Sequence, residues 1–62
     1  MDIENKTVIE ILQTDKWVQF ESCDLHEVPY RMRNIEQYYL GNNGWTAARA
    51  INNGCVVQLA YA

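Results

Sequence analysis

Apolar and polar residues alternate most clearly within residues 17–22. Val18 and Phe20 fall on one side of this segment, and Trp17, Gln19 and Glu21 fall on the other. A period of two is typical of a strand with one buried face. Thr14-Asp15-Lys16 comes just before this segment and predicts a turn, because an Asp side chain bonds to the backbone nearby.

A second alternating region, residues 45–61, contains two apolar runs separated by Asn53-Gly54. Both positions of a two-residue hairpin turn need positive φ, which Asn and Gly tolerate best. The pattern predicts a hairpin in which Ile51 faces Val56, although residues 45–52 also read as an alanine-rich helix. In the hairpin reading, one side is mostly core and holds Thr46, Ala48, Ala50, Val57, Leu59 and Tyr61.

Helical spacing is clearest over residues 34–40. Asn34 can cap the first turn, and Gln37 stands where a capping box needs it. Gly41 follows at the place where a left-handed residue often ends a helix. We therefore expect one central helix over about 34–40.

Two segments have no single interpretation. Residues 6–13 have apolar positions at helical spacing, yet their β-branched residues favour a strand; we expect a short helix here. Residues 27–33 fit either an edge strand or the start of a helix with Pro29 in its first turn. For both segments, helix and strand remain the two alternatives.

The expected fold is α+β: a small antiparallel sheet containing the strand at 17–22 and the hairpin at 45–61, with one central helix. The chain has 62 residues and 48% hydrophobic residues, which suit a single small domain over residues 1–62. At this length, the free energy gained by burying apolar surface nearly equals the conformational entropy cost of folding the chain. Because such a small fold is only marginally stable alone, burial of further surface in a dimer would stabilise it, and we expect a homodimer.

Cysteine content and the N-terminal segment favour a reducing compartment. Residues 1–5 lack the features of a secretory signal, and no apolar run is long enough to span a membrane. We therefore expect a cytoplasmic protein in which Cys23 and Cys55 are free and largely buried. With His26 they make three ligands where a zinc site needs about four, so no metal or cofactor is expected.

Catalytic groups are sparse. His26 has the sole side chain that titrates near neutral pH, and its neighbours Cys23 and Asp24 lie too close in sequence to make a nucleophile–base pair readily. We expect an exposed turn histidine and no enzymatic activity. The remaining enzymatic alternative is a toxin-type ribonuclease, in which His26 together with Arg31 or Arg33 acts on a phosphate.

Charge is divided unevenly along the chain. Residues 1–27 hold seven acidic and two basic side chains, whereas residues 28–62 hold three arginines and one glutamate. The second half also holds most of the aromatic residues, and Tyr, Trp and Arg are the usual anchors of protein interfaces. One short helix cannot cover both faces of a sheet, so an uncovered face with Trp45, Ile51 and Val56 is expected. The candidate partner-binding residues are Glu21, Asp24, Glu27, Tyr30, Arg31, Arg33, Trp45, Arg49, Ile51 and Val56.

Trp17–Ser22 followed by Glu27-Val28-Pro29-Tyr30 resembles the small phage-encoded inhibitors of bacterial RNA polymerase. The segment Tyr38–Ala62 also resembles small β-α-β-β domains, and together the likeness covers about two thirds of the chain. This chain departs from those inhibitors in its shorter helix and hydrophobic C-terminus. The resemblance implies a compact protein that regulates a larger machine by docking on it.

The expected function is a non-enzymatic protein-binding module, of phage or mobile-element type, that inhibits or regulates a larger host protein complex. The alternative is a small nucleic-acid-binding regulator that uses Arg31, Arg33, Arg49 and the tyrosines. The overall acidity, a net charge of −3, favours a protein partner over nucleic acid.

Overall fold

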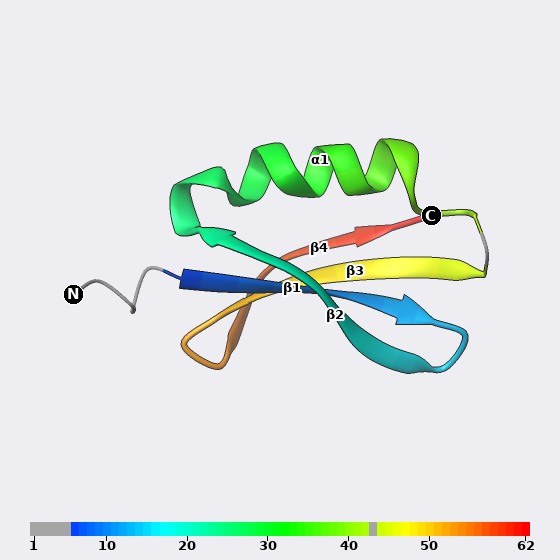
Figure 1. Ribbon diagram of the computed structural model, residues 1–62, viewed down its shortest axis with the longest axis horizontal. Coiled ribbons are helices and arrows are strands. Elements are labelled where there is room, and N and C mark those ends of the chain that lie inside the picture. Colours follow the sequence, from blue (N-terminus) through cyan, green and yellow to red (C-terminus); the bar gives the residue numbers. More distant parts are fainter. Residues whose placement is uncertain (1–5, 43) are drawn as a thin grey trace.

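The computed structural model describes residues 6–42 and 44–62. The strands are β1 (Lys6–Gln13), β2 (Lys16–Asp24), β3 (Trp45–Asn52) and β4 (Cys55–Tyr61). A 3₁₀ turn, η2 (Leu25–Glu27), leads from β2 into the helix α1 (Val28–Tyr38). The strands form one antiparallel sheet in the order β2-β1-β3-β4 (Figure 1). The α+β expectation and the hairpin at 45–61 are therefore confirmed.

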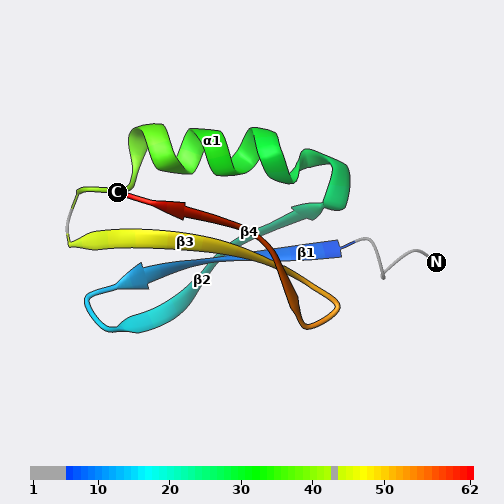
Figure 2. The same ribbon diagram turned by 180° about the vertical axis from the view of Figure 1, so that it is seen from behind.

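The molecule has two layers. The helix α1 runs along one face of the twisted sheet, and Figures 1 and 2 show no described element on the other face. We call these the helix-covered face and the open face. The helix packs chiefly against β3 and β4, so it lies toward the β4 edge of the sheet.

Residues 6–13 form strand β1, so the expected short helix is wrong. Thr7, Ile9 and Ile11 are fully buried and alternate with half-buried residues, which is the period of a strand. The β-branched residues favour this extended backbone. The spacing of Val8, Ile11 and Leu12 suggested a helix because short apolar runs fit both periods.

The helix begins six residues earlier than expected and ends two residues sooner, at Tyr38. Pro29 lies in its first turn, where the missing N–H costs nothing, so the open segment 27–33 is helical in its greater part. Asn34 lies inside the helix and caps nothing. Gly41, at φ +90°, follows three residues after the end of α1.

The hairpin has the predicted turn, but β4 has a different register from the one expected. Asn53 and Gly54 adopt φ of 54° and 79°, and Ile51 does pair with Val56. A β-bulge then shifts the register, so that Ala60 pairs with Ala48. A one-residue slip moves each side chain to the other face. Two residues expected in the core, Leu59 and Tyr61, are turned to the open face instead. Val57, also expected in the core, is the extra residue of the bulge and is 48% exposed.

Strand β2 contains a similar irregularity. Its pairing with β1 shifts so that Gln19 lies opposite Glu10 and Glu21 lies opposite Ile9. Glu21 was expected on the same side as Gln19. The shift instead places it on the helix-covered side, where it reaches Arg31 of α1.

The core lies between α1 and the sheet. Met32 and Ile35 of the helix are 1% exposed, and Ile9 and Ile11 of β1 are fully buried. The sheet residues under α1 on β3 and β4 are small, which lets the helix approach closely, whereas β1 carries the bulky residues. The small residues are Ala48, Ala50 and Ala60.

Both cysteines are free thiols, as expected, but only Cys23 is buried. Cys55 was expected to be buried and is exposed because it begins β4 beside the hairpin turn. The two cysteines stand on opposite edge strands, about 14 Å apart at the usual strand spacing, which is too far for a disulfide.

No described helix has the length and apolar character needed to cross a membrane. The expectation about a secretory signal concerns residues 1–5, which lie outside the described residues.

Candidate functional site

The open face of the sheet carries apolar side chains, and no described element covers it. Leu59 and Tyr61 of β4 are 49% and 63% exposed, and Val56 is 49% exposed. Each of these residues pairs across β3 with another open-face residue. The side chains that define the open face are Val8, Glu10, Leu12, Trp17, Ala47, Arg49, Ile51, Val56, Leu59 and Tyr61.

A fixed polar group lies at the centre of this face. Arg49 donates from Nε to Glu10 Oε1 at 2.8 Å, and its second nitrogen lies 2.7 Å from the same oxygen. The guanidinium also lies over the Trp17 ring, 4.0 Å from its centroid. The contacts hold both long side chains in place and neutralise their charges. The centre of the open face is therefore ordered and carries no net charge.

Trp45 does not lie on the open face, which corrects the expectation for this residue. A bulge near the start of β3 turns its ring to the helix-covered side. There it makes an aromatic cluster with Phe20 and Tyr39, with ring centroids 5.1 to 6.1 Å apart. This cluster closes the end of the core beyond α1, so Trp45 packs against the core rather than facing a partner.

The acidic and arginine candidates partly neutralise one another. The Arg31 guanidinium lies 3.5 Å from a carboxylate oxygen of Glu21 and 3.7 Å from one of Glu27, so three candidate residues form one half-buried ion-pair group. Arg49 is bound to Glu10. Among the candidate arginines, only Arg33 has no ion pair within the described residues. Phosphate binding needs several unpaired cations, so this arrangement disfavours the nucleic-acid alternative.

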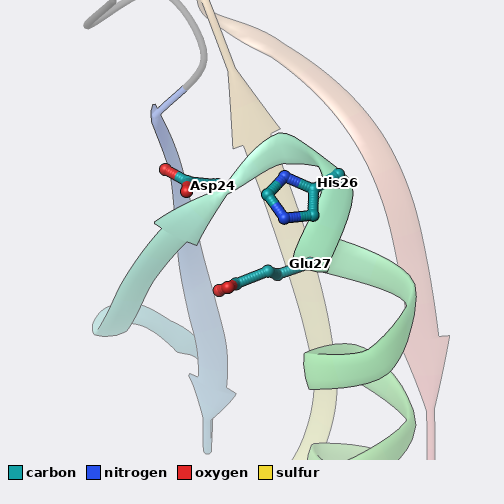
Figure 3. A group of neighbouring side chains, drawn as sticks. All are labelled: Asp24, His26 and Glu27. Carbon is teal, nitrogen blue, oxygen red and sulfur yellow. The ribbon is translucent and has the colours of Figure 1, made fainter.

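Asp24, His26 and Glu27 lie together at the turn from β2 into α1 (Figure 3). One ligand atom from each lies within 4.8 Å of the others, and His26 is exposed as expected. Glu27 is also shared with Arg31, and the positive end of the α1 dipole lies beside the group. Both neighbours disfavour a cation, so we assign no metal to these side chains.

A small hollow of about 170 Å³ lies between α1 and β2. Its lining includes Phe20, Tyr39 and the ion pair of Arg31 with Glu21. Pockets that enclose small organic ligands usually measure about 300 to 1,000 Å³. The hollow is below this range, so the open face is the stronger candidate for binding.

The last two candidate residues, Tyr30 and Ile51, lie on different sides of the molecule. Tyr30 is 69% exposed on α1, away from the open face, whereas Ile51 lies on the open face beside Val56. Sequence reasoning missed Trp17, Leu59 and Tyr61 as members of this face. The alternation in residues 17–22 does place Trp17 opposite the buried side, but no residue type signals the bulge that turns Leu59 outward.

No protein-family model, curated protein or solved structure matches this chain.

Proposed function

We propose that this protein is a non-enzymatic protein-binding module that docks on a larger protein through the open face of its sheet. The observation that carries the proposal is the exposure of Val56, Leu59 and Tyr61 together on a face that no described element covers. Contiguous exposed apolar surface of this kind is typical of interaction sites.

The charge of the open face supports a partner of definite chemistry. The Glu10–Arg49 pair leaves the centre neutral, and aliphatic and aromatic side chains flank it on both sides. A complementary surface is therefore apolar and uncharged at its centre, with polar groups at its rim. A basic groove or a nucleic-acid backbone has no matching charge here.

Docking of this kind suits inhibition or regulation of a larger host complex, because a small rigid module can occupy a surface that another subunit needs. The sequence resemblance to phage-encoded inhibitors of bacterial RNA polymerase implies the same class of action. The acidic group of Glu21, Asp24 and Glu27 is secondary in this proposal, since Arg31 engages two of its members.

The test is affinity capture from bacterial lysate, followed by a measured Kd for the captured protein. The open-face variant is Val56→Lys, which places a charge at a 49% exposed position without opening the core. We expect one stoichiometric protein partner and about a tenfold or greater loss of affinity in this variant.

Tyr30→Lys is the matched control, because it places the same charge at an exposed position on the helix-covered side. It should bind as the wild type does, and so should a variant with Glu21, Asp24 and Glu27 all neutralised. Equal affinity of Val56→Lys and the wild type would contradict the proposal. Capture that disappears on nuclease treatment would favour the nucleic-acid alternative instead.

A further inference from the structure

The two outer edges of the sheet differ in how they are protected. Strand β2, at one edge, carries Lys16, Glu21 and Asp24, and charges on an edge strand discourage pairing with another chain. Strand β4, at the other edge, contains no charged residue and no proline. No described strand pairs with its outer side, and Figure 2 shows β4 at the near edge of the sheet.

We propose that two copies of this chain pair through β4 across a two-fold axis at Leu59, which makes one eight-stranded sheet. The occupant of the β4 edge is thus a second copy of this chain. This inference goes beyond the proposed function, since it uses the backbone edge of β4 and, of the side chains that define the open face, engages only Leu59 and Tyr61.

The backbone determines which residues face the second copy. Ala62 donates its N–H to the Thr46 carbonyl at 2.9 Å, toward β3. Because alternate residues of a strand turn their backbone groups to opposite sides, those of Tyr61 and Leu59 point away from β3. An antiparallel pair centred on Leu59 places Tyr61 opposite Val57 of the second copy, an aromatic pair with a β-branched residue that favours sheet pairing.

The position of α1 adds a second contact to this pair. The helix lies over β3 and β4, so its axis projects about one strand spacing inside the two-fold axis. The two helices are then about two strand spacings apart, roughly 10 Å, which is the ordinary distance between packed helices. Strand pairing and helix packing therefore occur together in this geometry.

The side of α1 that meets its copy carries complementary charges. Arg31 and Asn34 line the hollow against β2, so the opposite side of the helix, with Arg33 and Glu36, lies toward the β4 edge. Both of these residues are exposed, and neither has an ion pair within the described residues. In two antiparallel helices, Arg33 of each copy lies opposite Glu36 of the other.

A symmetric dimer requires the strand contact and the helix contact to share one axis. Helix α1 and strand β4 run in the same direction (Figure 1). Leu59 lies about 3 Å past the middle of β4, and the midpoint of Arg33 and Glu36 lies about 2 Å past the middle of α1. The proposed dimer therefore requires the middles of α1 and β4 to lie side by side, so that one two-fold axis serves both the strands and the helices.

The test is sedimentation of the full chain at tens of micromolar, with circular dichroism to show that every variant is folded. We expect the wild type at twice the chain mass of 7.2 kDa. Arg33→Glu and Glu36→Arg should each weaken the dimer about tenfold or more at low salt, because each replaces two attractive pairs by repulsion. The double variant should recover wild-type affinity, and an equimolar mixture of the two single variants should form a heterodimer.

Leu59→Lys provides a second route, because it sets two like charges beside the two-fold axis and should give monomers. A wild type that stays monomeric at several hundred micromolar would overturn the inference. So would a dimer that resists Leu59→Lys and both charge reversals, or one abolished only by Val56→Lys, which would place the contact on the open face. If the wild type is monomeric but still binds its partner through Val56, the dimer is wrong and the proposed function stands.

Discussion

The two faces of this sheet come from the same strands but differ in what covers them. On the helix-covered face, buried Ile9 and Ile11 of β1 meet Met32 and Ile35 of the helix. On the open face, Trp17 and Leu59 flank a single ion pair, and Leu59 is 49% exposed whereas Trp17 is half-buried. Apolar content alone therefore does not distinguish the core face from the exposed one. Whether a second layer covers the face is what distinguishes them.

The largest expected effect separates two neighbours on β1 that face opposite ways. Ile9→Ala should lower the free energy of unfolding by about 3 kcal/mol, because Ile9 is fully buried and leaves a cavity. Val8→Ala, on the open face and half-buried, should cost less than about 1 kcal/mol. Urea denaturation followed by circular dichroism measures both. Equal losses would mean that the two faces are buried alike.

The two tryptophans allow the same comparison with aromatic side chains. Trp45→Ala should cost about 2 to 3 kcal/mol, because it removes one ring of the cluster with Phe20 and Tyr39. Trp17→Ala should cost about 1 kcal/mol, mainly from its contact with Arg49. Thermal unfolding of the two variants at one protein concentration gives the ranking. A larger loss for Trp17→Ala would contradict it.

The ion pair on the open face, Glu10–Arg49, should be stronger than the pair of Arg31 with Glu27 on the helix-covered side. A double-mutant cycle of Glu10→Gln and Arg49→Met should give a coupling of about 1 kcal/mol, since two short contacts join partly buried groups. The cycle for Arg31 with Glu27 should give about 0.3 kcal/mol, because that pair is longer and more exposed. A cycle near zero for Glu10 and Arg49 would mean that the centre of the open face is not held by this pair.

The thiols give the smallest effect on stability. Burial raises the pKa of Cys23, and the Arg31 guanidinium only partly opposes this. The folded chain thus holds this proton more tightly than the unfolded chain. The resulting stabilisation is fully present below pH 9.0, the usual value, and is lost as the pH rises through the folded pKa.

Two measurements check this contrast. In Ellman's assay at pH 8, Cys55 should react as an exposed thiol and Cys23 about a hundredfold more slowly. The decline of stability above pH 9.0 should be smaller in Cys23→Ala than in the wild type. Two thiols of equal reactivity would show that Cys23 is accessible.

Local signals explain which parts of the fold are predictable from the sequence. Asn53-Gly54 requires a tight turn with positive φ at both positions, so the hairpin is evident. Residues 6–13 are ambiguous because helical and strand periods overlap in a short apolar run, and only pairing with two neighbouring strands decides between them.

The composition of the open face is harder to predict, because it depends on bulges. The bulge in β4 turns Leu59 and Tyr61 outward, and the one near the start of β3 turns Trp45 inward. Each bulge follows from how a strand fits its partner and the helix above it, which no local residue pattern encodes. Ile51 and Val56 precede the β4 bulge along the pairing and were placed correctly for that reason.

The most direct measurement of the open face is an NMR comparison of the isotope-labelled chain, free and with its captured partner. Docking through the open face predicts that the largest shift changes occur at the side chains of Leu12, Val56 and Leu59. Ile35 and Met32, on the buried side of α1, should change little. Changes concentrated on the exposed side of α1 instead, around Tyr30, would contradict docking through the open face.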